Sequence, residues 1–223
     1  MEGEGLQLSI DPAVSVKVGF LQLTGCRITE SSDALRAVFD RAVEQARERF
    51  ADMPPGEHPV AAGVRRLFKS LGMDPTRYRP SAEALVRRAL KDQDLYHINC
   101  IVDINNICSI ESLFPLGVYD RAQINGDVEI RLGTTDDIYQ GIGREINIAE
   151  KLVSADSEGA FGSPIADSAR TKVTEDTHDI LVLLYAPPDT EDSAVRDTLE
   201  HFVELAGAHA GARAVTSGIR DAA

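Results

Sequence analysis

The sequence predicts an α/β fold, of the α+β kind, in which a mixed sheet is flanked by helices. Three observations support this. Residues 14–20 place apolar side chains at every second position, the period of a strand. Residues 180–185 form an unbroken apolar run, typical of a central strand covered on both faces. Other segments carry apolar stripes at helical spacing. No linker separates these segments, so we expect residues 1–223 to form a single domain.

The first part of the chain is expected to be mainly helical. Residues 31–33 (Ser-Ser-Asp) offer N-cap chemistry for a helix that runs to about Phe50, and the Met-Pro-Pro-Gly segment at 53–56 ends it. A second helix is predicted over 59–71, because its apolar residues recur on one side and Gly72 suits a C-terminal cap.

Two proline dipeptides then predict turns. In Asp74-Pro75 and Arg79-Pro80, the proline disfavours the helical conformation for the residue before it. Ser81 is expected to cap a helix over 82–91, and apolar residues at helical spacing predict another helix over 98–113.

The second half is expected to alternate strands with turns. Residues 128–132 alternate as a strand, and residues 134–177 are rich in Gly, Ser, Thr and Asp. The latter composition indicates short strands and turns that build a site. After the apolar strand, a helix over 192–206 is expected to end at Gly207, and a final strand is expected at 212–217.

Composition and short motifs exclude several classes of protein. No apolar run approaches the roughly 20 residues of a membrane helix, and the first residues lack the features of a signal peptide. The three cysteines show no Cys-x-x-Cys spacing, so we expect free thiols in a reduced cytoplasm. Scattered histidines and the absence of phosphate-binding and dinucleotide-binding motifs predict neither a metal nor another cofactor.

Charge is unevenly distributed along the chain. The formal net charge of −13 argues against a non-specific polyanion binder, and we expect no DNA partner. One span of the sequence is nevertheless basic, through Arg65, Arg66, Lys69, Arg77, Arg79, Arg87, Arg88 and Lys91. Two interpretations stay open: a basic face that meets RNA, or helix surfaces with solvated side chains.

One candidate constellation directly precedes the apolar strand. His178 could act as a base oriented by Asp176 or Asp179, with Thr177 beside it. In the alternative interpretation, residues 174–177 form a capped turn whose hydroxyls bond their own backbone.

A second set of candidates lies between residues 72 and 120. Asn105 and Asn106 could fix an amide or carbonyl of a ligand, or satisfy neighbouring backbone in a core helix. Arg79 could hold a carboxylate or phosphate, or pair with Asp74 or Glu83. A Pro-Leu-Gly turn is expected to follow the helix that carries the two asparagines.

Four phrases of this sequence, in order, resemble the tRNA-binding and editing domain of the bacterial phenylalanyl-tRNA synthetase beta subunit. They are Val-Asp-Ile-Asn-Asn at 102–106, Phe-Pro-Leu-Gly-Val-Tyr-Asp at 114–120, Ala-Asp-Ser-Glu-Gly at 155–159 and Val-Thr-Glu-Asp-Thr at 173–177. The resemblance covers about residues 72–187. It implies the fold of that domain, which in the synthetase hydrolyses tyrosine wrongly attached to phenylalanine tRNA. The Arg-Pro-Ser element at 79–81 resembles freestanding members of the family, which lack the rest of the synthetase.

The resemblance also implies a position for the pocket. Asn106 matches an asparagine of the family, and Asn105 stands where the family has threonine. Gly117 occupies the position of a histidine, and residues 164–168 occupy that of a glycine-rich stretch. A strand glutamate of the family falls near Val182 or Leu183, both of which are apolar here.

Two hypotheses of different classes follow. The first is an aminoacyl-tRNA deacylase acting in trans, with His178 and Asn106 as catalytic residues. The expected substrate-binding residues are Arg79, Ser81, Asn105, Asn106, Gly117, Ala166, Asp167, Ser168, Arg170 and Thr177. The second is a non-catalytic protein that binds an RNA end or a small amino-acid-like molecule. The resemblance does not extend to the modules that attach amino acids to tRNA, so a ligase activity is not expected.

Overall fold

A four-stranded antiparallel sheet in the order β10-β2-β9-β3 forms the centre of the fold. The computed structural model describes residues 7–91, 95–135, 137–141 and 145–222. The strands of this sheet are β2 (Lys17–Thr24), β3 (Leu116–Asp120), β9 (Ile180–Ala186) and β10 (Arg213–Asp221). All seven residues of β9 are buried, as the apolar run predicted.

A second, mixed sheet covers one side of the central one. Its order is β1-β4-β7-β8, and β1 pairs with β4 in parallel while the other pairs are antiparallel. The strands are β1 (Leu8–Ile10), β4 (Val128–Leu132), β7 (Leu152–Asp156) and β8 (Gly159–Gly162). Two further short strands, β5 (Ile138–Gln140) and β6 (Glu145–Asn147), pair with each other in antiparallel fashion. The mixed sheet with flanking helices confirms the predicted fold class.

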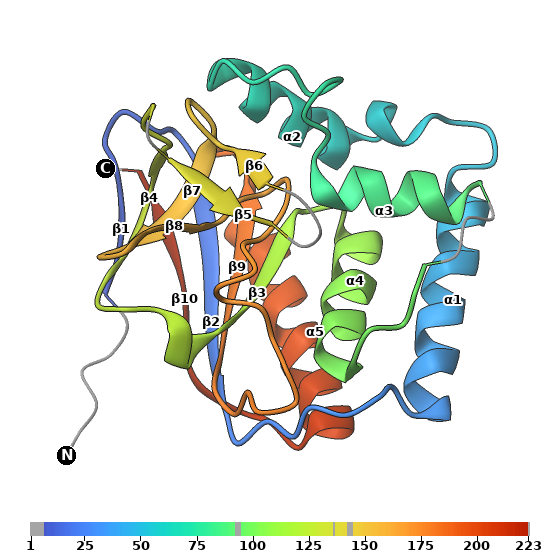
Figure 1. The fold of residues 1–223 in the computed structure, drawn as a ribbon. Helices are drawn as coiled ribbons and strands as arrows, with labels where there is room; N and C mark the ends of the chain where they lie inside the picture. The colour runs from blue at the N-terminus through green and yellow to red at the C-terminus, as the bar shows by residue number, and fades with distance from the viewer. Residues whose placement is uncertain (1–6, 92–94, 136, 142–144, 223) are drawn as a thin grey trace.

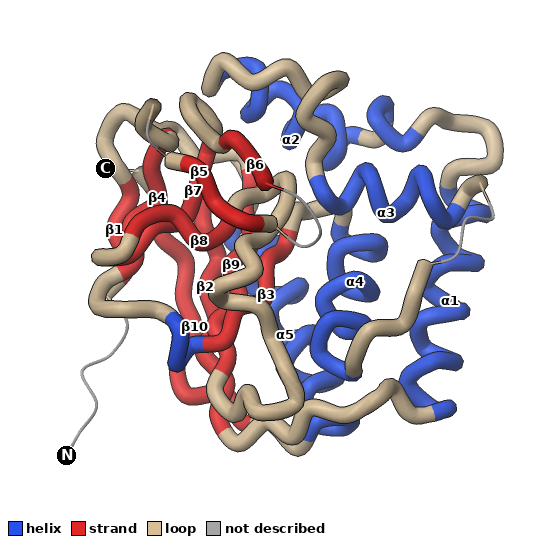
Figure 2. The backbone as a smooth tube through the Cα atoms, viewed as in Figure 1, coloured by secondary structure: helices blue, strands red, loops and turns tan. Residues whose placement is uncertain are grey.

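Helices form the other side of the molecule, as Figures 1 and 2 show. They are α1 (Asp33–Arg49), α2 (Pro59–Ser70), α3 (Ser81–Ala89), α4 (Cys100–Ser112) and α5 (Asp192–Ala210), with short 3₁₀ turns η1 (Pro55–Glu57) and η2 (Arg121–Gln123). α4 and α5 contact the central sheet, and α1 packs outside α4. The close approach of α5 to β2 requires Gly19, since a Cβ there would lie 2.5 Å from Cγ1 of Val195.

Several boundaries differ from the sequence expectations. Residues 17–24 are mostly buried rather than half-exposed, because β2 lies between β9 and β10. The expected Pro-Leu-Gly turn is wrong: the strand β3 starts at Leu116. α5 continues through Gly207 to Ala210, and Gly211, with φ of +65°, caps it. β1 was not predicted at all.

The start of α3 also corrects one expectation. Ser81 is the first residue of the helix, the N-cap position belongs to Pro80, and no side chain caps this end. The Ser81 hydroxyl is instead buried without a hydrogen-bond partner. Within the described residues, none of the helices is both long enough and apolar enough to cross a membrane.

Candidate functional site

A buried carboxylate fixes the start of α4, the helix that carries Asn105 and Asn106. Asp103 is fully buried and accepts hydrogen bonds from the Ser31 hydroxyl at 2.6 Å and the Ile98 amide at 3.2 Å. Nδ1 of His97 lies 2.5 Å from its Oδ2. These contacts connect the start of α4 both to the segment before it and to the residues that precede α1.

The two asparagines lie differently on α4. Asn105 is buried, and its Nδ2 donates to the Leu116 carbonyl at 3.5 Å, which favours the interpretation as a core helix residue that satisfies neighbouring backbone. Its Oδ1 is nevertheless buried without a partner, and so is the hydroxyl of Ser109 one turn later. Asn106 is half-buried. Ser109 was not predicted, because a lone serine in an apolar helix carries no distinguishing sequence signal.

Gly117 makes room for a tyrosine rather than for open space. A Cβ at Gly117 would lie 2.0 Å from the hydroxyl of Tyr119, and one at Gly162 would lie 2.3 Å from it. The Tyr119 ring, which is fully buried and packs edge-on against Phe161, therefore fills the space between these two glycines.

The Tyr119 hydroxyl donates to Asp167 at 2.8 Å. Burial raises the pKa of Asp167 to about 7, although the hydrogen bond from Tyr119 acts in the opposite direction. Burial also raises the pKa of Tyr119 well above its ordinary value. Tyr185 bonds Ser154 nearby, and the Tyr139 hydroxyl donates to the Ala166 carbonyl. These three tyrosines form a buried polar cluster that sequence reasoning missed, because each reads as an ordinary core aromatic.

Three other predicted binding residues have internal partners. The Ser168 hydroxyl accepts from the Arg170 amide at 3.0 Å. The Arg170 guanidinium holds Asp156 with two bonds of 2.9 and 3.0 Å. Thr177 accepts from the Thr174 amide at 3.0 Å, as the capped-turn interpretation expected, and it also donates to Asp120 at 2.9 Å, which was not predicted.

His178 lies away from the asparagines. Its ring is exposed, and Nδ1 lies 3.3 Å from the Cys26 carbonyl oxygen. No hydrogen bond joins it to Asp176 or Asp179 in the described structure. Gly117 pairs with Leu183 in the middle of β9, whereas His178 lies two residues before that strand begins at Ile180.

Three arginines of the basic span surround one buried acid. Glu83, 2% exposed, receives two bonds from Arg65 at 3.1 and 2.9 Å and one from Arg87 at 2.9 Å. Nε of Arg79 lies 3.7 Å from it and has no hydrogen-bond partner. The pairing of Arg79 with Glu83 was one of the two alternatives read from the sequence, whereas the contact with Arg65 was not predicted.

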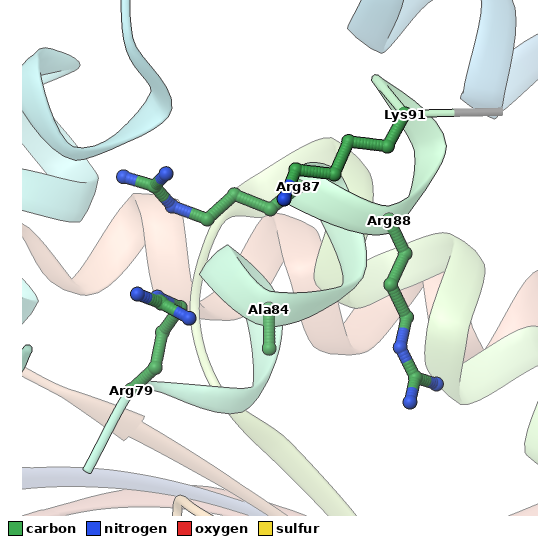
Figure 3. Close-up of a pocket in the computed structure, with 5 residues that line it drawn as sticks. All are labelled: Arg79, Ala84, Arg87, Arg88 and Lys91. Atoms are coloured by element: carbon green, nitrogen blue, oxygen red, sulfur yellow. The ribbon is translucent and has the colours of Figure 1, made fainter. Parts of the chain in front are cut away.

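A pocket of about 250 Å³ opens beside this cluster. It is lined by Arg79, Ala84, Arg87, Arg88 and Lys91, from α3 and its two ends. In Figure 3, the side chains of Arg79 and Arg87 extend to the same side, that of Lys91 runs back along the helix, and that of Arg88 extends the other way. The pocket can therefore hold an anion.

The predicted residues thus fall into three places. Ser81 donates its amide to the Pro164 carbonyl, and so joins the start of α3 to the loop that carries Ala166 and Asp167. Asn105, Gly117 and Asp167 lie around β3. His178 lies apart. Across the part of the chain that the structure describes, no group of three or more metal-binding side chains occurs.

Comparisons with known proteins bear on the family and the fold of this chain. The sequence pattern of the family described as the B3/4 domain matches residues 63–216. A solved N-terminal fragment of the phenylalanyl-tRNA synthetase beta subunit from Pyrococcus horikoshii superposes with a TM-score of 0.50 at 14% sequence identity. The match covers 95% of this chain and 50% of the fragment, so the chain spans about half the length of that structure. At this identity, the likeness shows the fold.

Proposed function

The chain belongs to the B3/4 domain family, and on this basis we propose that it is a tRNA-binding protein that recognises charged or uncharged tRNA. One observation carries the proposal beyond the family. On a chain of net charge −13, Arg65, Arg79, Arg87, Arg88 and Lys91 gather around α3. Phosphates are bound by such groups, and the surrounding acidity disfavours non-specific polyanion binding.

Direct binding of tRNA tests this function. We expect labelled tRNA to bind with an affinity that falls as salt rises, because each neutralised phosphate releases counterions. Charged and uncharged tRNA of several kinds, a DNA duplex of the same length and free amino acids form the panel. Equal affinity for DNA, or stabilisation by an amino acid alone, would contradict the proposal. Stabilisation by an amino acid alone would favour the alternative, a non-catalytic protein that binds a small amino-acid-like molecule.

Hydrolysis of wrongly charged tRNA in trans is the second candidate function. Asp167, whose pKa is raised to about 7, supports it, because a general acid or base works best when its pKa is near the working pH. Asp167 also falls in the stretch that matches a pocket segment of the resembled domain. In this candidate, Asn106 positions the ester and Asp167 moves the proton, while the His178 variant tests the base expected from the sequence, which lies apart from them.

Release of amino acid from mischarged tRNA distinguishes the two. The panel includes tyrosine on phenylalanine tRNA, and the variants are Asn106→Ala, Asp167→Asn and His178→Ala, with the exposed Asp189→Asn as the control. Under hydrolysis, Asn106→Ala and one proton-transfer variant slow release, while the control does not. If every substrate releases its amino acid at the uncatalysed rate, the hydrolysis candidate is contradicted and only tRNA binding remains.

We place the proposed function in the cytoplasm, consistent with three buried free thiols.

A further inference from the structure

Glu83 organises positive charge that exceeds its own. Its carboxylate contacts three guanidinium groups, of Arg65, Arg79 and Arg87, so the cluster carries an excess of two positive charges. Gly56 of η1 packs against it, since a Cβ there would lie 3.5 Å from Oε1 of Glu83. The acid therefore holds the arginines of α2 and α3 in fixed positions that mutual repulsion would otherwise disfavour.

Two more cationic side chains, Arg88 and Lys91, line the pocket. Arg88 and Lys91 are exposed, and no ion pair to either is present among the described residues. Nε of Arg79 is buried 3.7 Å from Oε1 of Glu83 without a hydrogen-bond partner, whereas its side chain as a whole is 39% exposed and lines the pocket. The pocket thus combines excess positive charge with guanidinium donors whose positions Glu83 fixes. A bound anion would offset that charge and accept hydrogen bonds from those donors.

We propose that the pocket lined by Arg79, Arg87, Arg88 and Lys91 is a phosphate-binding site, which holds one phosphate group of a bound RNA. Glu83 acts as a positioning residue. Nε of Arg87 is engaged by Glu83, which leaves the terminal nitrogens of its guanidinium fork for two oxygens of one phosphate. The RNA as the source of the phosphate rests on the proposed function; the site itself does not.

Two kinds of binding measurement separate the site from its source. The first follows inorganic phosphate and pyrophosphate by phosphorus NMR and by thermal stabilisation. The second follows tRNA binding as a function of salt. The variants are Arg88→Ala and Lys91→Ala, which make no contact with Glu83 and so leave the cluster intact, and Arg87→Lys, which keeps the charge but loses the fork. Arg213→Ala, at the exposed start of β10, is the matched control.

We expect Arg88→Ala and Lys91→Ala each to weaken tRNA binding about tenfold, and to reduce the slope of affinity against salt by about one phosphate contact. Arg87→Lys should weaken binding with little change in that slope, and Arg213→Ala should change neither. Pyrophosphate should bind the wild type and compete with tRNA.

Different failures point to different proposals. If tRNA binds tightly and the pocket variants bind as well as the wild type, the phosphate site is refuted while tRNA binding stands. If pyrophosphate binding is lost in Arg88→Ala but no tRNA binds, the site stands and the source must be a small phosphorylated molecule. If neither pyrophosphate nor tRNA binds to the wild type, the phosphate-binding site is refuted.

Discussion

At the scale of single residues, the contact between Tyr119 and Asp167 carries the clearest energetic consequence. The folded state raises the pKa of Asp167 to about 7, and so it holds a proton that the unfolded chain releases near pH 4. Between these values the folded state binds more protons than the unfolded state. This group therefore lowers the free energy of unfolding as pH rises from about 4 to about 7.

The substitution Asp167→Asn should remove this dependence, because an amide keeps an acceptor for the Tyr119 hydroxyl and carries no charge. Since one pKa unit corresponds to about 1.4 kcal/mol, we expect the variant to be more stable than the wild type at pH 8 by on the order of 2–4 kcal/mol. The two proteins should converge near pH 4. Urea unfolding at a series of pH values measures the difference.

Asp189→Asn, an exposed position, serves as the control for this experiment. It should follow the wild type at every pH. An Asp167→Asn variant that is less stable than the wild type at pH 8 would mean that the carboxylate is ionised and stabilising in the folded protein.

Some residue roles could be predicted from the sequence, and others could not. Thr177 in a capped turn and Arg79 beside Glu83 involve neighbours in the chain, and both were among the stated alternatives. The contact of Tyr119 with Asp167 joins positions 48 apart, so no local pattern encodes it. Gly117 illustrates the same limit, because its neighbour Tyr119 is visible in the sequence but the direction of that ring is not.

At the scale of elements, Glu83 connects three of them: η1, α2 and α3. Replacing it by glutamine leaves the arginines without a counter-charge in a partly buried place. Breaking a fully buried pair costs about 3–5 kcal/mol, but Arg79 and Arg87 reach solvent, so we expect Glu83→Gln to cost about 2 kcal/mol. Chemical denaturation measures it against Glu57→Gln, an exposed position on η1. Equal stability of the two variants would show that solvent screens the cluster fully.

The C-terminal end of α5 gives a paired prediction. Gly207 lies inside the helix, and a Cβ there meets nothing closer than 3.7 Å, so Gly207→Ala should stabilise the protein by about 0.5–1 kcal/mol. Gly211 has φ of +65°, so Gly211→Ala should destabilise it by about 1 kcal/mol. Thermal unfolding of both variants tests the assignment. The opposite order would mean that the helix ends at Gly207, as the sequence suggested.

Helices were easier to predict than strands. α1 and α2 begin and end close to the expected residues, because capping and breaking residues act locally. β1 and β3 were missed, since their existence depends on partners elsewhere: β1 pairs with β4, and β3 with β9. Leu116 to Asp120 is fully buried yet contains glycine, which weakened its strand signal.

At the scale of the whole molecule, two charge effects oppose each other. The net charge of −13 makes the compact state repel itself, whereas the basic pocket on α3 attracts anions. Raising sodium chloride from about 20 to about 200 mM screens both effects. We therefore expect the melting temperature of the free protein to rise while tRNA affinity falls. A melting temperature that falls with salt would show that ion pairs outweigh the general repulsion.

The fold class could be predicted because the spacing of apolar residues indicates helices and strands. The arrangement of the candidate site could not be predicted, because it depends on contacts between residues far apart in the sequence. The basic span and the two asparagines were visible as residues, but Glu83 and Arg65 meet only when α2 and α3 pack. The separation of His178 from Gly117 likewise follows from strand register, which the sequence alone does not encode.

The pairing of β2 with β10 has a consequence for how the protein is made. β2 is synthesised well before its partners β9 and β10, which lie far along the described chain. Until then, both edges of β2 expose unpaired backbone groups, which can pair with other chains. Nascent chains released before Arg213 should therefore aggregate or recruit chaperones, and the fold as a whole can close only after translation has passed β10.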